Sequence, residues 1–266
     1  MIDEVGDLLR EAAAQAVLPW FSRLTDDHIA EKAPGDLVTV ADRRAEEIIT
    51  AGLYRLAPDS VVVGEEAVAD DPGLLRRLRE DGRVWLVDPI DGTANFAAAR
   101  RPFVMMVALL EAGTAVASWI FDPIAGTLAV AERGAGCHVD GVRLPAASES
   151  APLSLLRGAV PVKYLPVRLR VTVEAGGDQV GAVLPGQHCA GREHWDIAAG
   201  TQDFALFWRT LPWDHVPGTL LVTETGGVAR RLDGSPYDYT DDRSGLLVAR
   251  SESTWHELHR VLLSTT

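Results

Sequence analysis

The chain has 266 residues, of which 47% are hydrophobic, so it is long enough to bury a sizeable core. Acidic residues outnumber basic ones by 38 to 25, and the net charge of −13 argues against nonspecific binding of nucleic acid or anionic membranes. Two cysteines predict no disulfide framework, and the acidic N-terminus lacks a signal-peptide core. No apolar run reaches the roughly 18 residues of a membrane span. We therefore expect a soluble cytoplasmic protein with neither nucleic-acid nor membrane partners.

Helices and strands are expected to alternate along the first half of the chain. An amphipathic helix is predicted over residues 2–24, and a second one runs to Leu56 after a capping box formed by Thr39 and Asp42. A helix is also expected at 73–81. Strands are expected at 60–64, 84–87, 103–110, 115–121, 127–131 and 137–139.

The second half continues this mixed pattern. Residues 167–175 fit either a strand, from their alternation, or a helix, from their length. Further strands are expected at 157–160, 180–184, 204–207 and 245–249, and helices at 194–200, 213–225 and 252–263. No repeat or low-complexity linker divides the chain, so we expect an α/β protein of layered sheets and helices over 1–266, with halves of about 1–150 and 151–266.

Two acids follow a buried strand in the stretch V84-W-L-V-D-P-I-D-G-T-A-N-F96. Asp88 and Asp91 are expected at the rim of a sheet, where α/β folds place their sites. Gly92 permits a backbone with positive φ, and Thr93 can begin a helix whose free N–H groups face an anion. This short loop therefore offers two carboxylates for a cation and a helix start for a phosphate.

Other oxygen donors occur at similar places in the sequence. Glu65 ends the preceding strand, the carbonyl of Ile90 lies between the two acids, and Asp214 is predicted as the N-cap of a helix with Pro217 as its third residue. Mg²⁺ takes oxygen ligands and shares them with phosphate and water. Taken singly, each acid has a simpler explanation as a turn, a cap or a solvated loop residue. Taken together, each acid begins or ends a distinct element, which favours a metal site.

Four segments, in order and at matching spacing, resemble the inositol monophosphatase family of metal-dependent, lithium-sensitive phosphatases. They are K32-x-P-x-D-L-V-T-x-A-D42, G64-E-E66, W85-L-V-D-P-I-D-G-T-A-N-F96 and W213-D-x-x-x-G…E224-x-G-G227. The third of these is a highly specific motif, and G134-A-G-C-H-V-D-G141 is similar to the family's glycine-rich stretch. The resemblance implies a five-layer α/β/α/β/α sandwich of the inositol monophosphatase and fructose-1,6-bisphosphatase type, and a homodimer.

The resemblance also implies roles for individual residues. The positions that match the ligands of two or three Mg²⁺ ions are Glu65, Asp88, the carbonyl of Ile90, Asp91 and Asp214. Gly92 and Thr93 match the phosphate-binding helix start, Asp42 with Thr93 matches the pair that orients the attacking water, and Lys32 matches a loop lysine near the phosphate. Paired metal ions lower the pKa of a bound water and stabilise a leaving alkoxide. Phosphoryl transfer then needs positioning and charge neutralisation rather than a protein nucleophile.

The expected substrate pocket departs from the family in two places. The stretch F204-A-L-F-W-R-T-L-P-W-D214 lacks the acid that inositol-specific members use for sugar hydroxyls, and Trp208 or Arg209 falls near its position. The segment A190-G-R-E-H-W195 replaces a run of small residues. Two walls of the pocket have therefore changed together.

Two explanations fit the altered segment equally well. Arg192, Glu193 and His194 are expected to supply contacts to a polyol or an anion. Alternatively, Arg192 is a surface cation that pairs with Asp196, four residues further along the helix.

A small phosphorylated polyol is the expected substrate, with inositol 1-phosphate as the default. Histidinol phosphate, fructose 1,6-bisphosphate and 3′-phosphoadenosine 5′-phosphate are the alternatives within the superfamily. Asn95 and Phe96 after the D-G-T triplet favour the inositol group over the histidinol group. A weakly active binding or regulatory member is a further alternative, but every expected metal and water-positioning residue is present.

Overall fold

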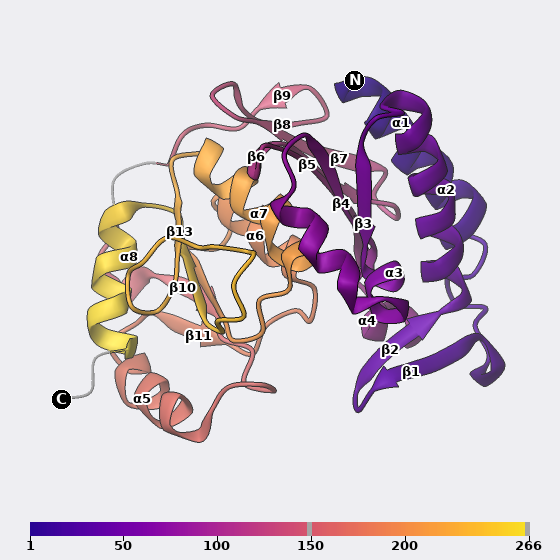
Figure 1. Cartoon of the computed structure of the whole chain (residues 1–266). Helices are drawn as coiled ribbons and strands as arrows, with labels where there is room; N and C mark the ends of the chain where they lie inside the picture. The colour runs from indigo at the N-terminus through magenta and orange to yellow at the C-terminus, as the bar shows by residue number, and fades with distance from the viewer. Residues whose placement is uncertain (148–150, 264–266) are drawn as a thin grey trace.

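The computed structural model, which describes residues 1–147 and 151–263, stacks two sheets and three layers of helices (Figure 1). The order is α/β/α/β/α, so the predicted five-layer sandwich is confirmed. The expected division of the chain near residue 150 falls on 148–150, outside the described residues. No helix in the described part of the chain is long and apolar enough to cross a membrane.

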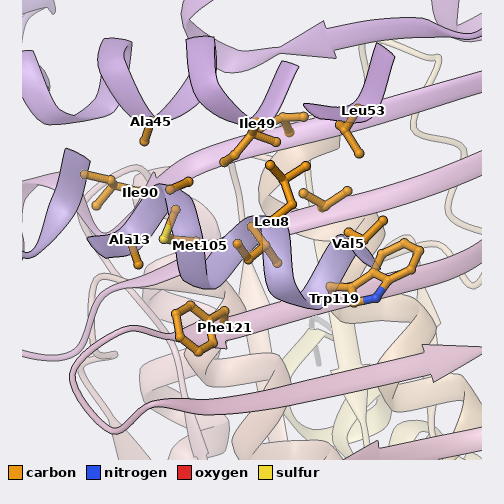
Figure 2. Packing of buried hydrophobic residues seen from close by; sticks show 14 of the residues in the cluster. Val5, Leu8, Ala13, Ala45, Ile49, Leu53, Ile90, Met105, Trp119 and Phe121 are labelled. Carbon is orange, nitrogen blue, oxygen red and sulfur yellow. The ribbon is translucent and has the colours of Figure 1, made fainter. Parts of the chain in front are cut away.

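Helices α1 (Ile2–Ala12) and α2 (Val40–Leu56) cover the outer face of the first sheet. Figure 2 shows their apolar side chains packed onto it, among them Val5, Leu8, Ala45, Ile49 and Leu53. Helix α1 continues as one π-helical segment, η1 (Ala13–Val17), and the helix predicted over 2–24 therefore ends early. The reason is that Trp20 and Phe21 turn back onto the same core. The capping box of Thr39 and Asp42 is confirmed at the start of α2.

The first sheet has seven strands in chain order. They are β3 (Val61–Gly64), β4 (Arg83–Asp91), β5 (Val104–Glu111), β6 (Thr114–Asp122), β7 (Thr127–Glu132), β8 (Gly136–Val139) and β9 (Val142–Arg143). Only the β3–β4 pair is parallel, and it sets Gly64 opposite Val87. Because parallel neighbours end at the same edge of a sheet, the next residues, Glu65 and Asp88, emerge side by side.

Strand β4 runs four residues further than predicted, to Asp91. Its pairing with β5 shifts between Asp88, opposite Met106, and Asp91, opposite Val104. Pro89 has no N–H to donate at this irregularity, which is where a strand tolerates proline. The irregularity re-aims the backbone, so that the side chain of Ile90 enters the core beneath α1 and α2.

Helices α6 (Ala190–Ala199) and α7 (Pro212–Glu224) fill the layer between the sheets (Figure 1). The prediction that Asp214 caps α7 is wrong. The cap is Leu211, and Pro212 takes the first helical position, where its fixed φ fits and its missing N–H costs little. Asp214 is therefore the third helical residue, and Pro217 lies inside the helix, where it cannot donate to the carbonyl of Trp213.

The second sheet has the order β11-β10-β12-β14-β13. Its strands are β10 (Arg157–Ala159), β11 (Ala182–Leu184), β12 (Phe204–Phe207), β13 (Val228–Arg230) and β14 (Leu246–Ala249). Its outer face carries α5 (Val167–Gly177), which settles the ambiguous segment as a helix, together with α8 (Glu252–Leu258) and the π-helical η5 (His259–Leu263).

Short elements complete the molecule. A hairpin of β1 (Ile29–Ala33) and β2 (Asp36–Thr39) precedes α2. The remaining helices are α3 (Glu65–Asp70), α4 (Thr93–Ala97) and the 3₁₀ segments η2 (Asp26–His28), η3 (Pro72–Arg79) and η4 (Leu153–Leu155). The segment predicted as a helix at 73–81 is thus a 3₁₀ helix.

Candidate active site

An open cavity of about 210 Å³ lies where β3 and β4 end, beside the start of α7. Its size suits a small molecule. The predicted residues that line it are Glu65, Asp88, Ile90, Asp91, Gly92, Thr93, Glu193 and Asp214. Segments 150 positions apart in the sequence thus meet at one cavity.

The acids of this cavity repel one another. Burial, followed by repulsion from Glu65 and Asp91, raises the pKa of both Asp88 and Asp214 well above the usual range. Burial also raises the pKa of Asp91 to about 6, although the N–H of Gly191 opposes that shift. Oδ1 of Asp88 is buried and has no hydrogen-bond partner among the described residues. The acids are therefore crowded together, and a bound cation would favour their ionised forms.

Lys32 is the cation closest to these acids. Its Nζ atom lies 2.7 Å from Oε1 of Glu65 and 2.8 Å from Oε1 of Glu66. Burial alone would lower the pKa of Lys32, but the two carboxylates outweigh burial and raise it. The hairpin β1–β2 therefore brings a charged ammonium group to Glu65, one of the acids predicted to bind metal, and to its neighbour Glu66.

Buried Asp42 and half-buried Thr93 form a hydrogen-bonded pair beside the acids. Oγ1 of Thr93 lies 3.1 Å from Oδ1 of Asp42 and 2.9 Å from the carbonyl oxygen of Ile90. Burial raises the pKa of Asp42 to about 7, although hydrogen bonds from Thr39 oppose the shift. Since a hydroxyl has one proton, Thr93 donates to one of its two acceptors at a time and keeps lone pairs free to accept a hydrogen bond from a water.

Two glycines shape the backbone around Asp91. Gly92 has φ of +93°, and an added Cβ would lie 3.1 Å from the carbonyl oxygen of Pro102. The N–H of Gly191 donates to Oδ2 of Asp91 over 2.6 Å, and a Cβ there would lie 2.3 Å from Sδ of Met106. The sequence analysis singled out Gly92 but not Gly191. The feature that could have pointed to Gly191 is that it remains a small residue in the segment 190–195, whose other residues mostly depart from the family's run of small residues.

The donor set of the cavity suits Mg²⁺ in its chemistry. All the acidic donors are carboxylate oxygens, they repel one another, and one oxygen of Asp88 has no other partner. The side chains do not yet form a closed ligand set, because no three His, Cys, Asp or Glu side chains among the described residues converge on one point. Lys32 contributes to this, because it holds Glu65.

A family model described as "Inositol monophosphatase family" matches residues 2–265. The chain belongs to the inositol monophosphatase family. An inositol-1-monophosphatase from Mesorhizobium japonicum is 32% identical over 238 residues, covering 87% of this chain and 85% of the relative. A fructose-1,6-bisphosphatase/inositol-1-monophosphatase from Thermotoga maritima is 27% identical, covering 85% of this chain and 83% of the relative. The solved structure of the Thermotoga maritima IMPase TM1415 superposes with a TM-score of 0.83 at 24% identity, covering 98% and 96% of the two chains.

The family is one of phosphatases, and the names of its members differ in substrate. The altered segment 190–195 is therefore informative. Glu193 lines the cavity, but it is 1% exposed and both its oxygens accept hydrogen bonds, from the N–H of Gln187 over 2.6 Å and from Nε2 of Gln202 over 2.7 Å. Its carboxylate is thus committed to holding the wall together.

The other two residues of that segment point elsewhere. Arg192 pairs with Asp196 over 2.8 Å, which is the second of the two explanations offered for it, and it is not among the residues that line the cavity. His194 is completely buried and stacks on Phe207 with ring centroids 5.1 Å apart. Burial lowers the pKa of His194 to about 4, so its ring is neutral. Neither side chain is placed to contact a ligand in the cavity.

The opposite wall contains residues that the sequence analysis missed. Lys163 and Tyr164 line the cavity together with Trp208 and Arg209, of which only the last two were considered beforehand. Nothing in the sequence around Lys163 marks it as a site residue, since its position depends on how the two sheets face each other.

Proposed function

We propose that this protein is a Mg²⁺-dependent phosphomonoesterase that hydrolyses a small phosphorylated substrate with an activated water. The buried, unpartnered oxygen of Asp88 carries the proposal, since it stands among acids whose mutual repulsion a bound metal cation would relieve. Two or three Mg²⁺ ions, when bound, would supply Lewis-acid activation of water and neutralise charge on the phosphate. Glu65, Asp88, Asp91, Asp214 and the carbonyl of Ile90 are the residues proposed to hold them.

The roles of the chain's own groups follow from their positions. Thr93 positions the attacking water, because its proton is held by Asp42 or by the carbonyl of Ile90 and its lone pairs are free. Asp42, with its pKa raised to about 7, is suited to accept the proton that the water loses. Gly92 and Thr93 begin α4 and are proposed to offer backbone N–H groups to the phosphate.

Lys32 is proposed to serve the phosphate as well. Its ammonium group is paired with Glu65 and Glu66 in this structure. If Glu65 were to hold a metal ion instead, the ammonium group of Lys32 would be free to bind a phosphate oxygen. Glu193 is proposed to maintain the cavity wall, and Arg192 has no part in binding.

Phosphate release across a panel of substrates tests this proposal. The panel holds inositol 1-phosphate as the default, with fructose 1,6-bisphosphate, histidinol phosphate and 3′-phosphoadenosine 5′-phosphate as the alternatives. Release that requires Mg²⁺ and is lost in Asp91→Asn supports the metal-dependent phosphatase. Release that persists in EDTA, or in Asp91→Asn, would contradict it, and no release from any substrate would favour the non-catalytic alternative.

Two expectations from the sequence stay predictions. A homodimer would give twice the monomer mass of 28.6 kDa in light scattering. Cytoplasmic location would be checked by cell fractionation.

A further inference from the structure

The wall of the cavity opposite the acids is built by two cations and an aromatic ring. Nζ of Lys163 lies 4.9 Å from the ring centroid of Tyr164, and Cζ of Arg209 lies 5.8 Å from it. All three residues line the cavity. We call Lys163, Tyr164 and Arg209 the cationic wall.

The topology of the second sheet explains why these residues meet. Strands β10 and β12 are parallel neighbours, with Ala159 opposite Ala205. The segments that follow them therefore leave the same edge of the sheet, and they carry Lys163 with Tyr164 and Arg209, respectively. Glu65, Asp88 and Asp91 leave an edge of the first sheet, and Asp214 belongs to α7, which follows Arg209 in the chain. The cavity therefore joins acids mainly from one sheet to cations from the other.

The cations of this wall are only partly neutralised. Arg209 donates to Oδ2 of Asp36 over 2.9 Å, and its side chain remains 36% exposed. Lys163 donates to the carbonyl oxygen of Gly35 over 3.0 Å, which is a neutral partner. Asp36 and Asp214 both attract the guanidinium group of Arg209, whereas Lys163 has only a neutral hydrogen-bond partner. An anion that enters the cavity would therefore meet the ammonium group of Lys163 and the guanidinium donors that Asp36 leaves free.

Arginine favours a particular class of ligand at such a position. Its planar guanidinium group has five N–H donors and no acceptor, and it binds carboxylate or phosphate through paired hydrogen bonds. Only one of these donors is used by Asp36 through Nη2. A carboxylate at this position would instead accept hydrogen bonds from sugar hydroxyls, which is what the sequence analysis expected of an inositol-specific pocket and did not find.

We propose that the cationic wall selects substrates whose leaving group carries a second anionic group, a carboxylate or a phosphate, over esters of neutral polyols. This rests on the proposed phosphatase activity and names its substrate class. The phosphate to be cleaved lies at the acidic side, and the second anion is held by Arg209 and Lys163 on the other side. Arg209 and Lys163 are thus specificity-determining residues.

A purely structural role is the rival explanation. Arg209 and Lys163 both hold the turn at Gly35–Asp36, and loss of either could loosen that turn. A loosened turn would affect every substrate alike. Loss of an anion contact would affect only substrates that carry the second anion. The two explanations therefore predict different ratios of kcat/KM between substrates with and without that anion.

Matched pairs of substrates measure that ratio. Glycerol 2-phosphate and 2-phosphoglycerate differ by a hydroxymethyl group replaced with a carboxylate, and fructose 1-phosphate and fructose 1,6-bisphosphate differ by a second phosphate. The measured quantity is kcat/KM for the anionic member divided by that for the neutral member. Because both values come from one preparation, a reduced folded fraction cancels in the ratio.

The wild type is expected to prefer the anionic member of at least one pair by about 10- to 100-fold, as for hydrogen bonds to a charged group. Arg209→Gln and Lys163→Gln should each lower that ratio at least about fivefold. Asp36→Asn removes the ion pair between Asp36 and Arg209 but leaves the arginine in place. This variant should therefore keep or raise the ratio. A preference in the glycerol pair would identify the second anion as a carboxylate, and a preference in the fructose pair would identify it as a phosphate.

Three results would overturn the inference. One is a wild type without preference in either pair. Another is an equal loss on both members in Arg209→Gln, as a loosened turn would cause. The third is a fall of the ratio in Asp36→Asn that matches the fall in Arg209→Gln. In each case Mg²⁺-dependent release from any member, or from inositol 1-phosphate, leaves the proposed phosphatase intact. No release from these four substrates together with no release from inositol 1-phosphate and the rest of the first panel would defeat both proposals.

Discussion

Oγ1 of Thr93 lies 3.1 Å from Oδ1 of Asp42, although 51 positions separate the two residues in the sequence. Asp42 belongs to the outer helix α2 and Thr93 begins α4 after the sheet edge. Their contact joins the first two layers of the fold at the cavity. A buried carboxylate that holds a threonine proton leaves the threonine oxygen as an acceptor for a water, so this pair is the natural place to test the mechanism.

Thr93→Val should lower kcat about 100-fold or more, because a positioned proton acceptor contributes on the order of 10²–10⁴ to rate. Thr93→Ser keeps the hydroxyl and should stay within about tenfold of the wild type. Steady-state kinetics at saturating Mg²⁺ measures both. Equal activity in the valine and serine variants would show that the hydroxyl does not orient the water.

The stability of the metal-free protein should fall as the pH rises from about 4 to about 7. In the folded state the pKa values of Asp42 and Glu46 are raised to about 7, chiefly by burial, from ordinary values of 3.8 and 4.5. The folded protein therefore binds more protons than the unfolded chain in this window, and raising the pH removes that advantage until both groups are ionised. Thermal unfolding in EDTA across this pH range measures the effect, and a Tm that rises from pH 5 to pH 7 would contradict it.

Mg²⁺ should stabilise the protein more at pH 8 than at pH 5. The ion binds ionised carboxylates, and it stabilises whichever state binds it. Burial and repulsion raise the pKa of Asp88 and Asp214, so fewer of these groups are ionised at pH 5. The difference in Tm with and without Mg²⁺ at the two pH values gives the result. A Ca²⁺-free buffer in which K⁺ replaces Mg²⁺ at the same ionic strength is the control for general screening of charge by salt.

Asp88→Asn should raise the stability of the metal-free protein at pH 8 and remove most of its response to Mg²⁺. The substitution deletes a buried charge that Glu65, Asp91 and Asp214 repel. Each kcal/mol of repulsion relieved should raise Tm by about 2–4 °C. Arg192→Gln is a matched surface control, which should keep the Mg²⁺ response. A destabilised metal-free Asp88→Asn protein would mean that repulsion is not the dominant property of this cluster.

Gly191→Ala should cost about 1–3 kcal/mol in the free energy of unfolding. The added Cβ would lie 2.3 Å from Sδ of Met106 and 2.8 Å from Cγ2 of Val104. Gly177→Ala is the matched control, because its Cβ would meet nothing closer than Val183 at 3.5 Å, and it should stabilise by about 0.4–1 kcal/mol. Urea unfolding of both variants compares them, and equal stabilities would show that the contact relaxes without cost.

Two of the misplaced element boundaries share one cause. The end of β4 and the start of α7 were both misplaced near a proline. A proline indicates an interruption of regular hydrogen bonding, but the sequence does not show whether it lies in a strand irregularity, in a first helical turn or inside a helix. The neighbouring strand β5 and the cap at Leu211 decide these cases. Glu193 and Arg192 were assigned to the pocket because of their place in the chain. Glu193 does line the cavity, but its hydrogen bond with Gln202 and the ion pair of Arg192 with Asp196 become visible only in the folded chain.

The sequence by itself determined the family, the order of elements and the acids at the ends of β3 and β4, because strand periodicity, capping boxes and the D-P-I-D-G-T segment are local in the chain. The tertiary structure alone decided which residues face those acids. Lys163, Tyr164 and Arg209 meet because β10 and β12 are parallel neighbours, and Gly191 reaches Asp91 because α6 lies between the sheets. Contacts of this kind depend on the packing of layers, for which no local pattern of residues carries a signal.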